Sequence, residues 1–282
     1  MERQFHHYID GKSHRPINGQ WIDSINPATG KVWAQIARGD EQDVDIAVKA
    51  AFRASQEPTW RNNASYRASV LDTVARRLDE SYEALVGVEV DDNGKRAVEV
   101  TAQMSALGGW YRHFAQLTDT IQFKGLKTDM KEVSVACDLI PFGVVAAITA
   151  WNSPLMIAAW KIAPALAAGN AVIIKPSELA SCSTVVFAEL VGNLLPNGIL
   201  NVITGFGLEA GASLVQHKGV RKITFTGSEL GGARVAATAA EQVKPTTLEL
   251  GGKSPQIVFE DADIEHTLNG IMSGIFLSNG QS

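Results

Sequence analysis

Small, polar and charged side chains follow five apolar segments in the second half of the chain. They lie at residues 150–154, 175–178, 204–207, 226–228 and 249–252. If the apolar segments are parallel strands, these residues gather at one edge of a sheet, where open α/β sheets bind ligands. The chemistry that they offer is recognition of a nucleotide and stabilisation of developing negative charge.

Lys175 and Glu178 are three residues apart where a helix is expected to begin. A carboxylate there can accept two hydrogen bonds from a ribose diol, and the ammonium group can donate to ribose or phosphate. The alternative is a surface ion pair at a helix start. The residues alone leave both interpretations open.

Three glycines and a Thr-Gly-Ser turn could bring the backbone close to a nucleotide. Gly205, Gly207 and Gly211 are one residue off the dinucleotide-binding fingerprint, and taken alone they favour the alternative of a tight turn. Residues 226–228 offer backbone N–H groups and a hydroxyl to an anion such as pyrophosphate. An ordinary helix N-cap is the alternative there.

Asn152 and Glu249 are the candidates for chemistry. The carboxamide of Asn152 can donate to an oxyanion, although a turn residue ahead of Pro154 would look the same. Glu249 ends an apolar segment, and burial would raise its pKa and suit it to act as a general base. A solvated strand end is the alternative. None of these groups is decisive alone. Their occurrence after successive predicted strands is what indicates a functional site.

Apolar strands that alternate with helices must position these groups. The predicted strands are 144–149, 171–174, 200–203, 222–225, 247–250 and 256–259. The predicted helices between them are 154–168, 180–194, 209–217 and 228–242. This alternation is typical of a parallel sheet covered on both faces.

The N-terminal part is predicted to be mainly helical after a turn-rich start. Residues 1–35 suggest small strands or an extended arm. Helices are expected from an N-cap at Asp40, around residues 70–78, and from Arg96 to Leu117. Residues 131–138 alternate polar and apolar, as an antiparallel strand does.

Composition limits the function classes. The chain has 282 residues, a net charge of -5 and 45% hydrophobic residues, which is typical of a globular protein and argues against a nucleic-acid or membrane-surface partner. Cys137 and Cys182 are the two cysteines, too few for a disulfide framework or a Cys-rich zinc site. We therefore predict no metal and a cytoplasmic location.

At this point the chain resembles the NAD(P)-dependent aldehyde dehydrogenase superfamily over essentially its whole length. The motifs are Asn26-Pro-Ala-Thr-Gly30, Pro141-Phe-Gly143, Trp151-Asn152, Trp160-Lys161, Lys175-Pro-Ser-Glu178, Leu195-Pro-Asn-Gly198, Phe225-Thr-Gly-Ser228 and Glu249-Leu-Gly-Gly-Lys-Ser-Pro255. The resemblance implies an α/β fold with a Rossmann-like parallel sheet, helices on both faces, a helical N-terminal region and a small antiparallel oligomerisation hairpin.

The resemblance also implies roles. Asn152 matches the oxyanion-hole asparagine, Glu249 the glutamate that activates water, and Lys161 an assisting lysine. The implied cofactor contacts are Ile148, Thr149, Trp151, Lys175, Ser177, Glu178, Gly205, Gly207, Phe225, Gly227, Ser228 and the Leu250 carbonyl. The implied substrate tunnel includes Ser153, Met156, Ile157 and Trp160. Because Glu178 would repel a 2′-phosphate, NAD is favoured over NADP. The partner is a small aldehyde that the sequence does not identify.

The domain boundaries follow the family pattern. Residues 1–123 and 143–249 would form the NAD(P)-binding domain, 124–142 the oligomerisation hairpin of a homodimer or homotetramer, and 250–282 the start of a catalytic domain. The family's nucleophile lies in a Gly-Gln-x-Cys motif, and this chain ends Asn279-Gly-Gln-Ser282. The cysteine is expected next, and Cys137 and Cys182 are expected to be packing residues.

Two hypotheses follow. In the first, the chain is the N-terminal part of an NAD-dependent aldehyde dehydrogenase and is inactive alone. In the second, it is a stand-alone nucleotide-binding module. A domain boundary is expected in an exposed linker, whereas residues 263–278 read as a helix, which favours the first hypothesis.

Overall fold

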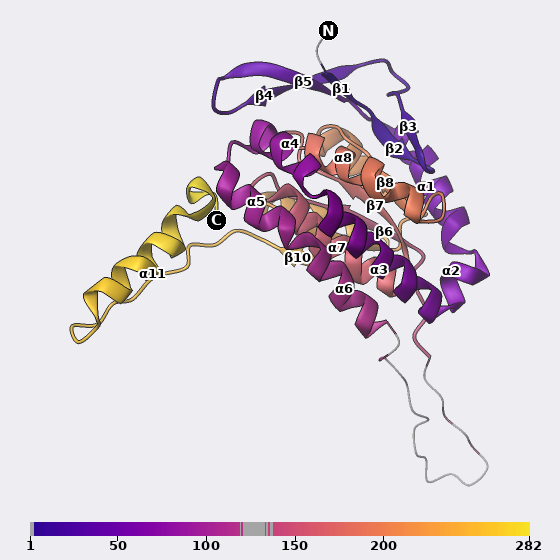
Figure 1. The fold of residues 1–282 in the computed structure, drawn as a ribbon. Helices are drawn as coiled ribbons and strands as arrows, with labels where there is room; N and C mark the ends of the chain where they lie inside the picture. The colour runs from indigo at the N-terminus through magenta and orange to yellow at the C-terminus, as the bar shows by residue number, and fades with distance from the viewer. Residues whose placement is uncertain (1–2, 119, 121–132, 134, 136–137) are drawn as a thin grey trace.

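A seven-stranded mixed sheet forms the centre of the computed structural model, which describes residues 3–118, 120, 133, 135 and 138–282 (Figure 1). The strand order is β10-β9-β6-β7-β8-β2-β3, and the first five strands are parallel. Their bounds are β6 Val144–Ile148, β7 Ala171–Lys175, β8 Leu200–Val202, β9 Lys222–Thr226 and β10 Thr246–Glu249. The predicted parallel sheet is confirmed for these five strands.

Helices cover both faces of the parallel strands. Right-handed crossovers place α7 (Pro154–Ala167) and α8 (Cys182–Val191) on one face. They place α9 (Ala212–Gln216) and α10 (Glu229–Ala240) on the other, where α1 (Glu41–Ser55) also contacts β6, β7 and α9. Every residue of β6 and β7 is therefore buried, as their unbroken apolar sequences predict.

The N-terminal residues form strands, and two of these enlarge the main sheet. β2 (His7–Ile9) pairs antiparallel with β8 and with β3 (Lys12–His14), so the sheet is mixed rather than wholly parallel. Turn-rich sequence signals a hairpin, but it does not show that the hairpin docks on the edge strand β8. A separate three-stranded sheet contains β1 (Arg3–Phe5), β4 (Trp21–Asn26) and β5 (Lys31–Ala37).

The helical region contains more helices than the sequence predicted. The helix predicted at Asp40 is confirmed, with Asp40 in a capping box. The predicted helix over 96–117 is two helices that meet at Ala106. Gly108 in the second of them lies so close to the helix over 64–81 that a Cβ there would clash with the Asp79 carboxylate. α4 was not predicted. The bounds are α2 Pro58–Asn62, α3 Ala64–Ser81, α4 Glu83–Asn93, α5 Ala97–Ser105 and α6 Leu107–Leu117.

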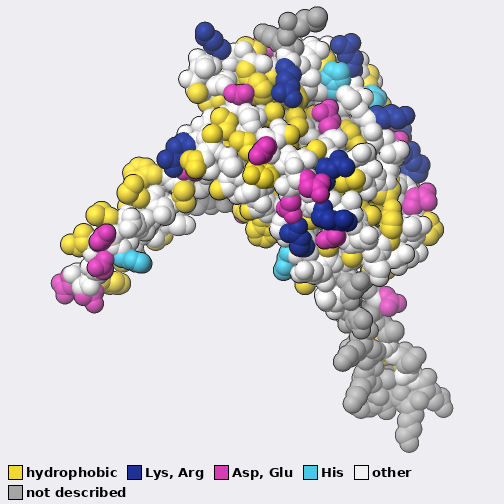
Figure 2. Space-filling model, in the orientation of Figure 1, with side chains coloured by type: hydrophobic (Ala, Val, Ile, Leu, Met, Phe, Trp, Pro, Cys, Tyr) yellow, Lys and Arg dark blue, Asp and Glu magenta, His cyan; other side chains and the backbone are white. Residues whose placement is uncertain are grey.

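Residues 250–282 form an arm that first leads away from the sheet. α11 (Ile264–Phe276) and the 3₁₀ turn Leu277–Gly280 then lead back, so that the C-terminus lies near α5 (Figure 1). The strand predicted at 256–259 is wrong, because these side chains are exposed and no described strand pairs with them. Figure 2 shows apolar side chains gathered on the arm, among them Phe259, Leu268, Met272 and Phe276.

Two further expectations concern particular segments. The predicted strand over 131–138 and most of the predicted hairpin over 124–142 lie outside the described residues. In the described part of the chain, no helix combines the length and the hydrophobicity needed to cross a membrane.

Candidate functional site

The sheet register brings the carboxyl ends of the parallel strands together. Ile148 lies opposite Lys175 on one side and Phe225 on the other, and Glu249 lies opposite Thr226. The residues predicted from five separate segments therefore gather along one edge of the sheet. This follows from parallel pairing, which aligns the strand ends.

The predicted ribose-binding pair is formed. Lys175 Nζ lies 3.0 Å from Glu178 Oε2, and the lysine side chain is only 2% exposed. Burial lowers the pKa of Lys175, and the Glu178 carboxylate partly offsets this effect. Burial by itself would raise the pKa of Glu178, but the Lys175 ammonium and the Gly207 backbone N–H hold it below its usual range. Glu178 is thus an ionised acceptor with one side toward solvent.

A cavity of 410 Å³ adjoins this pair. Four predicted cofactor residues line it, namely Ile148, Glu178, Gly207 and Phe225. Sequence reasoning missed the opposite walls, which come from α9 and α10 and include Val215, Arg234, Val235 and Thr238. Two carboxylates also line the cavity, Glu178 and Glu209, and Glu209 is paired with Arg38. Apolar walls beside the Glu178 carboxylate suit a flat ring system attached to a sugar.

Close approach explains the glycines of this region. A Cβ at Gly227 would lie 2.7 Å from the Phe225 ring, and one at Gly231 would lie 2.9 Å from it. Gly205 has φ +140, where a Cβ would press on the Gly39 backbone at 3.0 Å. Ser228 caps α10 by accepting from the Gly231 N–H at 3.1 Å. The capping alternative is therefore realised.

Glu249 and Lys161 come from different elements and interact. Thr226 Oγ1 donates to Glu249 Oε2 at 2.8 Å, and Lys161 Nζ donates to Thr224 Oγ1 at 3.0 Å. Burial lowers the pKa of Lys161, and the Glu249 charge partly offsets it. The expectation that Glu249 is buried is wrong, because β10 is an edge strand and leaves its carboxylate exposed.

Asn152 lies in the loop after β6, half-buried. Its Nδ2 donates to the Gln281 carbonyl at 2.8 Å. Sequence reasoning missed Asn93, whose Nδ2 donates to the Trp151 carbonyl at 2.6 Å and to Gln281 Oε1 at 3.2 Å. Neither a motif nor a hydrophobic period in α4 marks Asn93 as a site residue. Its role could not be predicted, because only the folded chain brings α4 next to this loop.

The remaining predicted residues are more scattered. Thr149 is buried beside Lys175, whose carbonyl accepts its N–H at 3.1 Å, and Ser177 Oγ accepts from the Leu179 N–H at 3.3 Å. Trp160 and Lys161 line a second cavity of 590 Å³, to which Ser153, Met156 and Ile157 do not contribute. The described residues do not unite the four predicted tunnel residues in one cavity. Leu250 packs against Gly232.

Cys182 is unsuited to nucleophilic chemistry. Its side chain is 0% exposed, and burial together with the neighbouring Asp92 carboxylate raises its pKa well above the usual range. Its backbone N–H donates to Asp92 Oδ2 at 2.8 Å, away from Asn152. Cys137 lies outside the described residues.

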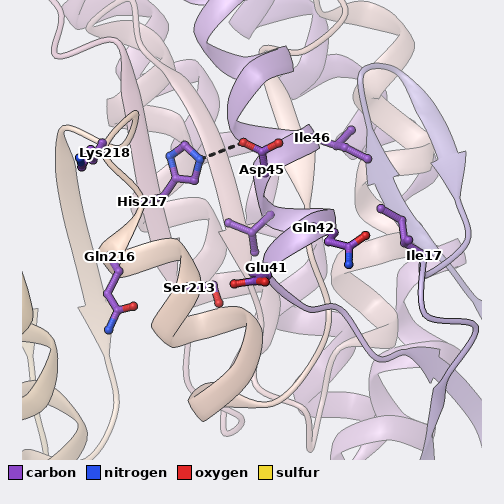
Figure 3. Close-up of a pocket in the computed structure, with 10 residues that line it drawn as sticks. Ile17, Glu41, Gln42, Asp45, Ile46, Ser213, Gln216, His217 and Lys218 are labelled. Carbon is purple, nitrogen blue, oxygen red and sulfur yellow. Dashed lines mark hydrogen bonds and ion pairs between the residues drawn. The ribbon is translucent and has the colours of Figure 1, made fainter.

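A larger cavity of 770 Å³ lies elsewhere, between the start of α1 and the end of α9 (Figure 3). His217 points across it and lies 3.4 Å from Asp45 Oδ1 (Figure 3). None of the predicted site residues lines this cavity. The strand edge, and not this cavity, therefore carries the candidate chemistry.

Known proteins resemble the chain over nearly its whole length. The sequence profile of the aldehyde dehydrogenase family matches residues 14–282. The chain is 41% identical to the peroxisomal aminoaldehyde dehydrogenase 1 of Pisum sativum, over 97% of this chain and 56% of that protein. The NAD+ complex of an aldehyde dehydrogenase from Bacillus cereus has a TM-score of 0.95 at 37% identity, over 99% of this chain and 57% of that one. Betaine aldehyde dehydrogenase from Staphylococcus aureus in complex with NAD+ has a TM-score of 0.92 at 35% identity, over 96% and 54%. The chain spans about half the length of the relatives that it matches.

Proposed function

We propose, because the chain belongs to the aldehyde dehydrogenase family, that the whole protein oxidises an aldehyde to a carboxylic acid with NAD. The observation that carries this proposal is the strand edge. Glu249 at the end of β10, Asn152 after β6 and Glu178 after β7 follow one another along it, and Glu178 lines a nucleotide-sized cavity. Because the relatives include an aminoaldehyde dehydrogenase and a betaine aldehyde dehydrogenase, aminoaldehydes and betaine aldehyde are the substrates to test first.

The residues fit NAD in shape and charge. The cavity of 410 Å³ offers the Ile148 and Phe225 side chains to an adenine ring, and Glu178 reaches the adjoining space where a ribose diol would lie. The first turn of α10 offers N–H groups to pyrophosphate. A 2′-phosphate would be repelled by the Glu178 carboxylate, so we infer that NAD is preferred over NADP. When bound, NAD would accept the hydride that leaves the aldehyde carbon.

The chain's own residues divide the chemistry into two steps. The Asn152 carboxamide donates to the oxygen that becomes negative when a thiolate adds to the aldehyde carbon. Glu249, exposed at the strand edge, accepts a proton from the water that later releases the acid from the thioester. Lys161 assists from behind Glu249: burial lowers the pKa of this lysine, and the nearby Glu249 charge partly offsets that effect.

The thiolate must come from a cysteine other than Cys182, which is buried and protonated. We infer that the cysteine that reaches Asn152 is neither Cys137 nor Cys182, and that the 282-residue chain alone does not oxidise aldehydes. A reducing compartment such as the cytoplasm suits this free thiol. We further propose the domain division given by the motifs: residues 1–123 and 143–249 bind NAD, 124–142 pair subunits of a homodimer or homotetramer, and 250–282 begin a catalytic domain.

The test is NADH formation by the whole protein with a panel of aldehydes, beside calorimetric titration of the 282-residue chain with NAD+ and NADP+. We expect NADH and acid from the whole protein, and NAD+ binding without turnover from the chain. NAD+ binding with no oxidation by the whole protein would favour a nucleotide-binding module. Absence of NAD+ binding would overturn both.

A further inference from the structure

The end of helix α4 contacts both segments that meet at Asn152. Asn93 is the last residue of α4 and is 5% exposed. Its carboxamide nitrogen donates to the Trp151 carbonyl at 2.6 Å and to Gln281 Oε1 at 3.2 Å. Asn152 donates in turn to the Gln281 carbonyl at 2.8 Å. Four residues from three separate parts of the chain thus form one hydrogen-bonded group.

Both acceptors of Asn93 are oxygens, so only an NH2 group can face them. The Asn93 Oδ1 atom is buried and has no partner among the described residues. That cost is tolerated because the nitrogen makes two bonds. An aspartate of the same shape would instead place a carboxylate oxygen against two oxygens.

Rigid packing holds this end of α4 in place. Lys95 and Glu89 form an ion pair at 3.3 Å with both side chains 0% exposed, and Lys95 Nζ also donates to Gln103 Oε1 at 2.6 Å. Gly94 takes φ +79, which ends the helix and lets the chain turn. The turn is thus anchored by contacts that do not depend on the loop it holds.

The same turn receives further bonds from the chain end. Asn279 Nδ2 donates to the Gly94 carbonyl at 2.9 Å, and the Ser278 N–H donates to Glu99 Oε2 at 2.8 Å. Residues 278–281 are therefore held against the α4–α5 turn. The Trp151 carbonyl belongs to the planar peptide that leads into Asn152, so fixing it orients the backbone at Asn152. The bond from Asn152 Nδ2 to the Gln281 carbonyl then orients the side chain.

We propose that Asn93 is a positioning residue for the oxyanion donor: it fixes the 151–152 peptide against residues 278–281 and so aims Asn152 at the reacting oxygen. This proposal rests on the proposed function. It places Asn93 outside the reacting atoms, acting through Asn152. A misplacement of about 1 Å can cost about 100-fold in rate, so the effect should be large for a residue that touches no substrate.

The first experiment is Asn93→Asp in the whole protein, with NADH formation and NAD+ affinity measured. We expect kcat/KM to fall by about 10- to 100-fold and the NAD+ Kd to change by less than about twofold. Asn170→Asp is the matched control, because Asn170 is 3% exposed and its Nδ2 donates to the Ala165 carbonyl at the opposite edge of the sheet. The control should lose stability but keep kcat/KM within about threefold.

A double-mutant cycle separates positioning from general damage. In an Asn152→Ala background, Asn93→Asp should lower kcat/KM by less than about threefold, because no donor remains to be aimed. An equal loss in both backgrounds would overturn the proposal, as would near-normal kcat/KM in Asn93→Asp itself. If Asn93→Asp does not fold, Asn93→Ala removes the donor without adding charge and is interpreted in the same way.

Hydrogen exchange supplies a readout without activity. In the 282-residue chain, Asn93→Asp should speed amide exchange in residues 277–281, whereas Asn170→Asp should not. Unchanged amide exchange in residues 277–281 would refute the proposal that Asn93 holds these residues in place. If the whole wild-type protein makes no NADH, the proposed function fails, and exchange still decides whether Asn93 holds these segments together.

Discussion

Replacing Glu178 by glutamine should weaken NAD+ binding by about 10- to 100-fold. The change keeps the side-chain shape and removes the charge that Lys175 Nζ contacts at 3.0 Å. A hydrogen bond to a charged acceptor contributes about 1.5–3 kcal/mol, against about 0.5–1.5 kcal/mol for a neutral one. The loss over two ribose hydroxyls is therefore about 2 kcal/mol. Because the repulsion of a 2′-phosphate also disappears, the preference for NAD+ over NADP+ should narrow.

The same change leaves the Lys175 ammonium buried without its partner. Lys175 is 2% exposed, while Glu178 is 31% exposed, so solvent screens part of the pair. We expect the free energy of unfolding to fall by about 1–2 kcal/mol, as measured by urea denaturation. Glu189→Gln on α8 is the matched control and should leave both cofactors' affinities unchanged. Calorimetry that finds the same NAD+ Kd in Glu178→Gln as in the wild type would refute the ribose assignment.

Three further predictions concern other parts of the chain. Burial lowers the pKa of Lys244 to about 8, so the unfolded chain binds more protons above that pH. The free energy of unfolding, measured with urea, should therefore rise by about 1 kcal/mol between about pH 8 and pH 10 in the wild type relative to Lys244→Met. A difference between the two proteins that does not change with pH would contradict this. Cys182 should resist alkylation until the chain unfolds, and Cys182→Ala should leave NADH formation by the whole protein within about twofold of the wild type. Leu268 and Met272 are 55% and 59% exposed on α11, so the chain alone should self-associate in sedimentation experiments and Leu268→Glu with Met272→Lys should reduce this. A monodisperse wild-type monomer would count against it.

Local sequence patterns predicted the parts of the fold in which each segment carries its own signal. The unbroken apolar segments of β6 and β7 predicted buried parallel strands, and Asp40 predicted the start of α1. Residues that follow parallel strands share one edge of the sheet by geometry, so the Lys175–Glu178 pair could be placed without knowing the fold in detail.

Features that depend on distant contacts could not be predicted in this way. α4 buries Glu89, Asp92 and Asn93 together with its apolar residues, so its sequence shows no clear apolar face. The 256–259 segment is apolar but has no strand to pair with among the described residues. Asn93 reaches Trp151 across 58 residues of sequence, which no periodicity reveals.

Pre-steady-state NADH formation by the whole protein tests the central claim most directly, because it separates the steps assigned to Asn152 and Glu249. Glu249→Gln should keep an early burst of NADH and slow only the later turnover, since its proton acceptor is needed after the hydride has left. Asn152→Ala should slow the burst itself by about 100-fold or more. A Glu249→Gln protein whose burst and later turnover slow equally would contradict the division of roles along this strand edge.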